Sequence, residues 1–149
     1  MVQDSQLFCV ETNNDQETKS WGVKCGQWLK NRHEVLSLIG DLGAGKTTFV
    51  QGVAIGLGIK EPVKSPTFVM LKEYNYNGGR LIHVDAYRLP SNFEDIGLED
   101  YWGQANVLIE WAENIVGLLP ANNINISFTH LAQTRRRICF AGILAGVMQ

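Results

Sequence analysis

Residues 40–47 read Gly-Asp-Leu-Gly-Ala-Gly-Lys-Thr, and these residue types at this spacing suit the binding of a nucleoside triphosphate. Glycines tolerate backbone conformations that turn consecutive amides toward phosphate oxygens. Lys46 can supply a positive charge to the β- and γ-phosphates, and the Thr47 hydroxyl can ligate Mg²⁺. The residues predicted to bind the nucleotide through this loop are Gly43, Ala44, Gly45, Lys46, Thr47 and Thr48.

Two carboxylates follow apolar runs that are typical of buried strands. Asp85 follows the run 81–84, and we expect it to hold Mg²⁺ together with Thr47; the alternative is that it caps the next turn. Glu110 follows the run 107–109 and can orient the attacking water, or it can cap the turn before Ala112. His83 shares a strand face with Asp85, where a hydrogen-bonded core histidine is at least as good an interpretation as an active one.

Two further side chains are candidates for the same site. Thr67, in Ser65-Pro66-Thr67-Phe68, follows a proline-restricted segment and can contact the γ-phosphate or its metal as a switch residue does. The predicted catalytic set is therefore Glu110, Thr67 and Asp85. Trp111 can pack on the nucleotide, or it can belong to the core or to an interface.

The arginines indicate a function less clearly than the carboxylates do. Arg88 can serve phosphate, a partner or RNA, and residues 135–137 are three consecutive arginines at the start of a terminal strand. We interpret this trio as solvated charge at a sheet edge, which discourages aggregation. No arginine has a spacing that marks it as an arginine finger supplied by this chain.

The loop needs a strand before it and a helix after it, and the chain supplies both. Residues 35–39 form a short apolar run, and residues 46–57 have apolar positions at helical spacing, with Gly58 as the stop. We also expect an edge strand at 7–10, a helix from 12–14 to about 30 and strands at 67–74, 81–84 and 107–109. A short helix near 92–102, an apolar turn at 118–120 and an antiparallel pair at 124–130 and 136–141 complete the prediction.

This order predicts an α/β fold of the P-loop NTPase-like kind, with three layers and a mixed central sheet flanked by helices. The 149 residues are expected to form a single domain, 1–149. A net charge of −2 argues against a protein that grips nucleic acid by itself. The chain has no apolar run long enough to cross a bilayer, so no membrane role is expected. Its three cysteines, Cys9, Cys25 and Cys139, lack metal-ligand spacing, and we expect reduced thiols and a cytoplasmic location.

Four separated segments resemble the bacterial TsaE (YjeE-like) ATPases of the tRNA threonylcarbamoyladenosine pathway. They are 40–48, 65–68, His83-Val84-Asp85-Ala86-Tyr87-Arg88-Leu89 and Glu110-Trp111, in the family's order. The resemblance implies weak ATP hydrolysis with Mg²⁺ and work in a complex with TsaB and TsaD, in which TsaD modifies tRNA, so that tRNA is met through the complex. It places Asp85 on the metal-binding aspartate, Thr67 on the switch-like segment and Glu110-Trp111 on the Glu-Trp pair. One departure is Ala112, where many relatives carry proline.

Two other classes remain as alternatives. A small-molecule P-loop kinase usually carries an arginine-bearing lid, and here the only arginine cluster is near the C-terminus. A GTPase switch normally has an Asn-Lys-x-Asp tetrad, which this sequence lacks, so ATP is the expected nucleotide.

Overall fold

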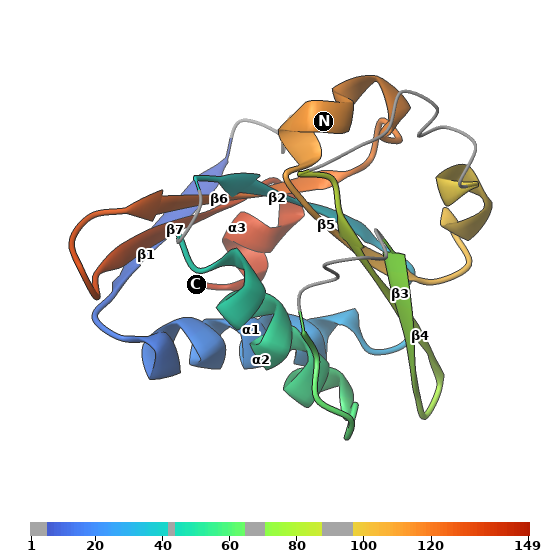
Figure 1. Cartoon of the computed structure of the whole chain (residues 1–149), viewed down its shortest axis with the longest axis horizontal. Helices are drawn as coiled ribbons and strands as arrows, with labels where there is room; N and C mark the ends of the chain where they lie inside the picture. Colours follow the sequence, from blue (N-terminus) through green and yellow to red (C-terminus); the bar gives the residue numbers. More distant parts are fainter. Residues whose placement is uncertain (1–5, 42–43, 65–70, 88–96) are drawn as a thin grey trace.

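The computed structural model describes residues 6–41, 44–64, 71–87 and 97–149 of the chain (Figure 1). In chain order its elements are β1 (Leu7–Thr12), α1 (Asp15–Leu29), β2 (Val35–Gly40), α2 (Lys46–Leu57), β3 (Leu71–Tyr76), β4 (Gly79–Asp85), the 3₁₀ helix η3 (Leu98–Tyr101), β5 (Asn106–Glu110), the 3₁₀ helix η4 (Ala112–Leu118), β6 (Ile124–His130), β7 (Arg136–Ala141) and α3 (Ile143–Val147).

The seven strands form one mixed sheet in the order β1-β7-β6-β2-β5-β4-β3. Strands β4, β5, β2 and β6 run parallel to one another, whereas β3, β7 and β1 pair with their neighbours in antiparallel fashion. The carboxyl ends of the four parallel strands therefore meet at one edge of the sheet, where open α/β sheets place their ligands.

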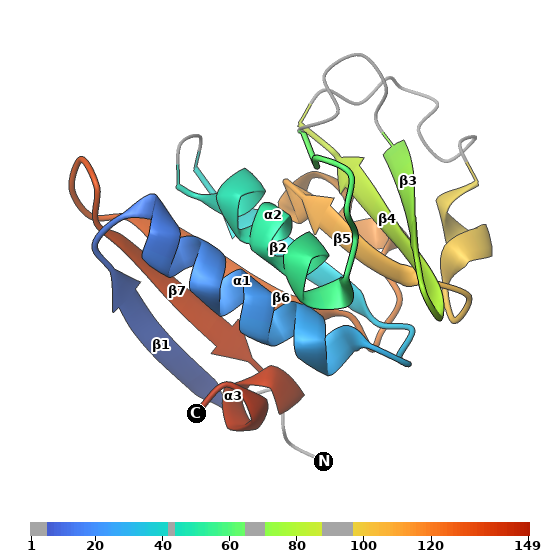
Figure 2. The same cartoon turned by 90° about the horizontal axis from the view of Figure 1, so that it is seen from below.

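Alternating residues of the central strands face two separate hydrophobic clusters, which makes the fold three-layered. On one face Leu36, Leu81 and Leu108 belong to one cluster with residues of α1, α2 and α3. On the other face Val35, Ile82 and Val107 pack with residues of η3 and η4. Figure 2 shows α1 and α2 side by side over the first face. The predicted α/β fold with a mixed sheet flanked by helices is confirmed.

Helices α1 and α2 touch through their backbones at four glycines. A Cβ added to Gly22 or Gly26 of α1 would lie 2.2 Å from a carbonyl oxygen of α2. A Cβ on Gly52 or Gly56 of α2 would lie 2.1 or 2.3 Å from a carbonyl oxygen of α1. Only glycine fits these positions, because real Cβ atoms do not approach other atoms so closely. This contact fixes α2 on α1.

Most predicted elements are present, with shifts at their ends. The helix predicted for 46–57 and the antiparallel pair at 124–130 and 136–141 coincide with α2, β6 and β7. The predicted strand at 67–74 is described only from residue 71 and extends to 76, because its hairpin with β4 turns at 77–78. Within the predicted helix 92–102, residues 98–101 form a 3₁₀ helix, and 92–96 lie outside the described residues. The predicted apolar turn at 118–120 begins at the last residue of η4. The sequence patterns did not predict the C-terminal helix α3.

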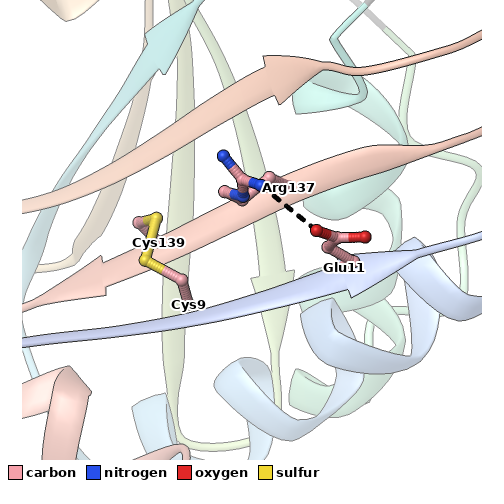
Figure 3. Close-up of a disulfide and its surroundings, with 4 residues drawn as sticks. All are labelled: Cys9, Glu11, Arg137 and Cys139. Carbon is pink, nitrogen blue, oxygen red and sulfur yellow. Dashed lines mark hydrogen bonds and ion pairs between the residues drawn. A yellow bond between two sulfur atoms is a disulfide. The ribbon is translucent and has the colours of Figure 1, made fainter.

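The expectation of three reduced thiols is wrong for two of them. Cys9 and Cys139 form a disulfide between β1 and β7 (Figure 3), and only Cys25 is free. The reason is the strand register, which places these cysteines directly opposite each other although they lie 130 residues apart in sequence. The cysteines therefore give no support to the predicted cytoplasmic location.

Candidate functional site

The two predicted carboxylates are neighbours where the parallel strands of the sheet have their carboxyl ends. Asp85 ends β4 and Glu110 ends β5, and the parallel register pairs these two residues directly. Strand β2, which leads into the glycine-rich loop (residues 40–47), lies on the other side of β5. The loop and both strand ends open onto one cavity of about 320 Å³, lined by Asp15, Ala44, Gly45, Lys46, Thr47, Thr48, Asp85, Tyr87, Glu110, Trp111 and Arg136.

The backbone turns sharply at Gly45, immediately before α2. Gly45 has φ 97°, a left-handed conformation that favours glycine, and its carbonyl accepts the hydrogen bond from the Phe49 amide at the start of the helix. Lys46 and Thr47 follow in the first turn, so their side chains and the helix N-terminus lie at the cavity. Gly43 of the predicted binding set lies outside the described residues.

The Lys46 side chain is held in place by several contacts, and the residue is only 5% exposed. Its ammonium donates to the carbonyl oxygens of Gly40 and Asp41 and lies 3.7 Å from the centroid of the Trp111 ring. Burial lowers the pKa of Lys46, whereas the nearby Glu110 carboxylate acts in the opposite direction. The structure thus brings the predicted cation into the cavity in a partly desolvated position.

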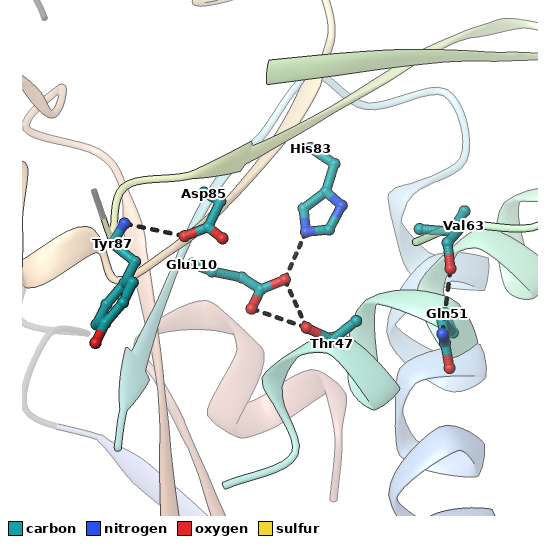
Figure 4. Close-up of polar contacts among 7 residues, drawn as sticks. All are labelled: Thr47, Gln51, Val63, His83, Asp85, Tyr87 and Glu110. Atoms are coloured by element: carbon teal, nitrogen blue, oxygen red, sulfur yellow. Dashed lines mark hydrogen bonds and ion pairs between the residues drawn. The ribbon is translucent and has the colours of Figure 1, made fainter. Parts of the chain in front are cut away.

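Thr47 and the buried residues Glu110 and His83 form a polar chain (Figure 4). The Thr47 hydroxyl donates to the Glu110 carboxylate, 3.0 Å from Oε1 and 3.1 Å from Oε2. His83 Nε2 lies 2.6 Å from Glu110 Oε2, and His83 is fully buried. The interpretation of His83 as a hydrogen-bonded core residue is confirmed, and its partner is the predicted catalytic glutamate.

Asp85 and Trp111 each contact Tyr87 and also line the cavity. Asp85 Oδ1 accepts from the Tyr87 amide at 2.9 Å, as in the turn-capping alternative, while Asp85 also lines the cavity. Trp111 has φ 61°, unusual for a non-glycine residue, and its ring packs on Tyr87 with centroids 4.8 Å apart. This conformation directs the chain from β5 into η4 and keeps the indole beside Lys46.

Arg136 is a cavity residue that the sequence patterns did not predict, and its interpretation as solvated edge charge is wrong. Arg135 and Arg137 do pair with Glu11 at the sheet edge. Arg136, between them, lines the cavity from β7. The signal available in sequence was strand alternation, which places the middle arginine of the trio on the opposite face from its two neighbours.

Two predicted residues besides Gly43 are not placed by the structure. Thr67 and Arg88 lie outside the described residues. Among the described residues, no cluster of three or more His, Cys, Asp or Glu side chains could hold a metal ion. Mg²⁺ at phosphate-binding sites needs only one or two protein oxygens besides the phosphates, so the pair of Thr47 and Asp85 remains a suitable donor set.

A second cavity, of about 520 Å³, lies at the other end of the parallel strands, beside the starts of β2 and β6. It is lined by Glu34, residues 121–125 and residues 141–143, which include no lysine, arginine or histidine. We therefore assign the candidate site to the smaller cavity, where the cation, hydroxyl and carboxylates meet. In the described part of the chain, every helix is too short or too polar to traverse a lipid bilayer.

The fold and this site define an α/β protein in which a Gly-Lys-Thr loop joins a central parallel strand to a helix, with acidic residues at the two neighbouring strand ends. The family profile described as "Threonylcarbamoyl adenosine biosynthesis protein TsaE" matches residues 12–138. The chain belongs to the TsaE family.

Individual relatives agree with this assignment. The chain is 43% identical over 133 residues to the tRNA threonylcarbamoyladenosine biosynthesis protein TsaE of Bacillus subtilis, covering 89% of this chain and 84% of that protein. It is 42% identical over 140 residues to the protein of the same name from Treponema pallidum, covering 91% of this chain and all of that protein. The crystal structure of YdiB from Bacillus subtilis matches with a TM-score of 0.79 and 38% identity, over 93% of this chain and 86% of that one.

Proposed function

We propose that this protein is an ATP-binding, slowly ATP-hydrolysing subunit that supports threonylcarbamoyladenosine modification of tRNA together with TsaB and TsaD. The observation that carries the proposal is the convergence of Lys46, Thr47, Asp85 and Glu110 on one cavity. The names of the relatives, which place them in tRNA threonylcarbamoyladenosine biosynthesis, support the pathway.

Lys46 and the amides of the glycine-rich loop would bind the phosphates. On binding, the Lys46 ammonium would exchange the carbonyl oxygens of Gly40 and Asp41 for phosphate oxygens, a stronger charge-assisted interaction. Trp111, which already lies against this ammonium, would line the nucleotide site.

The donor set fits Mg²⁺, because Thr47 and Asp85 present a hydroxyl and a carboxylate to the same cavity and Mg²⁺ prefers oxygen ligands. When bound, the ion would neutralise charge on the phosphates. Thr47 and Asp85 would hold it, the Thr47 hydroxyl through an oxygen lone pair while its proton still points to Glu110.

Glu110 would then orient the attacking water, in the role predicted from its position at a strand end. His83 would keep the carboxylate in place through its hydrogen bond to Oε2. Thr67 remains a proposed switch residue on the grounds of the sequence.

Within the described residues, the one arginine lining the cavity is Arg136, which lies on the far side of β2 from Glu110. We therefore expect slow hydrolysis by the protein alone, with a partner supplying the missing stabilisation.

The proposal is tested by measuring ATP hydrolysis with the protein alone, then with TsaB, TsaD and tRNA. We expect slow turnover alone and clear stimulation by the partners, which are expected to contact tRNA themselves. Asp85→Ala should abolish Mg²⁺-dependent hydrolysis and retain part of the nucleotide affinity.

Turnover that is indifferent to the partners, with phosphate transferred to a small acceptor, would instead establish the kinase alternative. A clear preference for GTP in a binding titration would contradict the choice of ATP.

A further inference from the structure

Arg136 is the cavity residue for which the proposed function has so far given no role. It comes from β7, and its side chain lies against the glycine-rich loop from the side of the β6–β7 hairpin. A Cβ added to Gly45 would lie 3.8 Å from Arg136 Cγ and 4.0 Å from its Nε. The arginine therefore lies beside the backbone immediately before Lys46.

The hairpin holds the guanidinium through Nη1. Nη1 donates to the carbonyl oxygens of Ala132, Gln133 and Arg135, at 3.0, 3.2 and 3.1 Å. Nε is buried and has no acceptor among the described residues. A buried donor without an acceptor is costly, and charged donors more so. A ligand oxygen would satisfy it once a small movement of the side chain exposes Nε to the cavity.

The neighbouring arginines show that this arrangement is specific to Arg136. Arg135 and Arg137 both pair with Glu11, and their side chains are 49% and 46% exposed. Figure 3 shows Arg137 with Glu11 beside the disulfide. Both hydrogen bonds lower the pKa of Glu11, which therefore keeps its charge and its two partners. Arg136 is thus the member of the trio whose side chain lines the cavity.

The sheet order indicates which part of a nucleotide Arg136 would meet. Strand β2 lies between β5 and β4 on one side and β6 and β7 on the other. The groups proposed for the metal and the attacking water, Asp85 and Glu110, come from β4 and β5. Arg136 approaches from the opposite side, away from the position that these residues assign to the γ-phosphate.

We propose that Arg136 is a nucleotide-binding residue that contacts the α-phosphate end of the diphosphate shared by ATP and ADP. The inference rests on the proposed function, since it assumes that the cavity binds a nucleotide. The guanidinium would donate through Nε to a phosphate oxygen while Nη1 stays anchored to the hairpin. This contact should therefore contribute equally to the affinity for ATP and to the affinity for ADP.

The test is calorimetric titration of Mg-ADP and of a non-hydrolysable ATP analogue into the wild-type protein, Arg136→Ala and Arg136→Lys. Arg135→Ala and Arg137→Ala are matched controls from the same hairpin. Arg136→Ala should weaken both nucleotides about 10- to 100-fold, the range expected for one charge-assisted hydrogen bond, and leave their affinity ratio unchanged. The controls should bind like the wild type. Arg136→Lys should recover only part of the loss, because it keeps the charge and loses the planar fork.

The outcomes separate this inference from the proposed function. Equal affinities of Arg136→Ala and Arg135→Ala would overturn the inference while the site stands. A loss confined to the ATP analogue would also overturn it, since it would assign the arginine to the γ-phosphate. No binding of either nucleotide by the wild type would refute the proposed function itself.

A second measurement covers the case in which Arg136→Ala does not fold. The ³¹P chemical shift of the α-phosphate of bound ADP is then compared between the wild type and Arg136→Lys. A changed shift supports the contact between Arg136 and the α-phosphate, and an unchanged shift contradicts it.

Discussion

The Glu110 carboxylate accepts a hydrogen bond from the Thr47 hydroxyl, at 3.0 Å to Oε1, across 63 residues of sequence. The same carboxylate is bonded to the buried ring of His83. A residue proposed to act on water is thus already oriented by two groups from other elements. Such support is what a positioned carboxylate needs in order to act with a defined geometry.

Glu110→Gln should therefore slow ATP hydrolysis by about 100-fold or more, in the range seen for loss of a general base or water-orienting group. Nucleotide affinity should change little, because the amide oxygen of the introduced glutamine would still accept from Thr47. Single-turnover hydrolysis and ADP titration separate the two effects. Glu113→Gln, an exposed carboxylate in η4, is the control and should hydrolyse ATP normally. Equal rates for the two variants would reduce Glu110 to a turn residue.

Nucleotide binding should weaken at alkaline pH as Lys46 loses its proton. Burial lowers its pKa from the ordinary value of 10.5, so the charged form that binds phosphate is lost at a lower pH than for an exposed lysine. The dissociation constant for ADP should rise as pH increases through this lowered pKa. Lys46→Ala should bind triphosphate very weakly, and its residual affinity should not follow this titration. Wild-type affinity that stays constant up to pH 10.5 would contradict the assignment.

Gly52→Ala should destabilise the fold by about 1–3 kcal/mol or more, the usual cost of overpacking. Its new Cβ would lie 2.1 Å from the carbonyl oxygen of Lys19, so α1 and α2 would have to separate. Urea unfolding gives the free energy directly. Gly146→Ala in α3 meets nothing within 4 Å and is the matched control, expected to be neutral or stabilising. Equal effects at both positions would show that the helices do not rely on this contact.

The Cys9–Cys139 disulfide predicts a specific thiol count. Unfolded, non-reduced protein should show one reactive thiol, from Cys25, and reduction should raise the count to three. In the native state Cys25 should react slowly, because burial raises its pKa to about 12 and keeps it in the thiol form. Reduction should also lower the free energy of unfolding by about 2–4 kcal/mol. Three reactive thiols before reduction would contradict the bond.

Local sequence patterns predicted the elements that carry the site. The apolar run at 35–39, the glycine-rich loop and the helix at 46–57 are adjacent in the chain, so residue type and period were enough to identify them. Asp85 and Glu110 could be placed at strand ends for the same reason. The spacing of Gly22 with Gly26, and of Gly52 with Gly56, was also present in the sequence, but a four-residue interval does not say which helix will approach.

What the sequence by itself determined about this protein is the set of elements and the residues at their ends, since these depend on neighbours a few positions away. The tertiary structure alone decided that Glu110 bonds to Thr47 and His83, that Cys9 meets Cys139, and that only the middle arginine of residues 135–137 lines the cavity. Each of these contacts joins segments far apart in the chain. They are set by strand order and register, which emerge only when the whole sheet assembles around its two hydrophobic clusters.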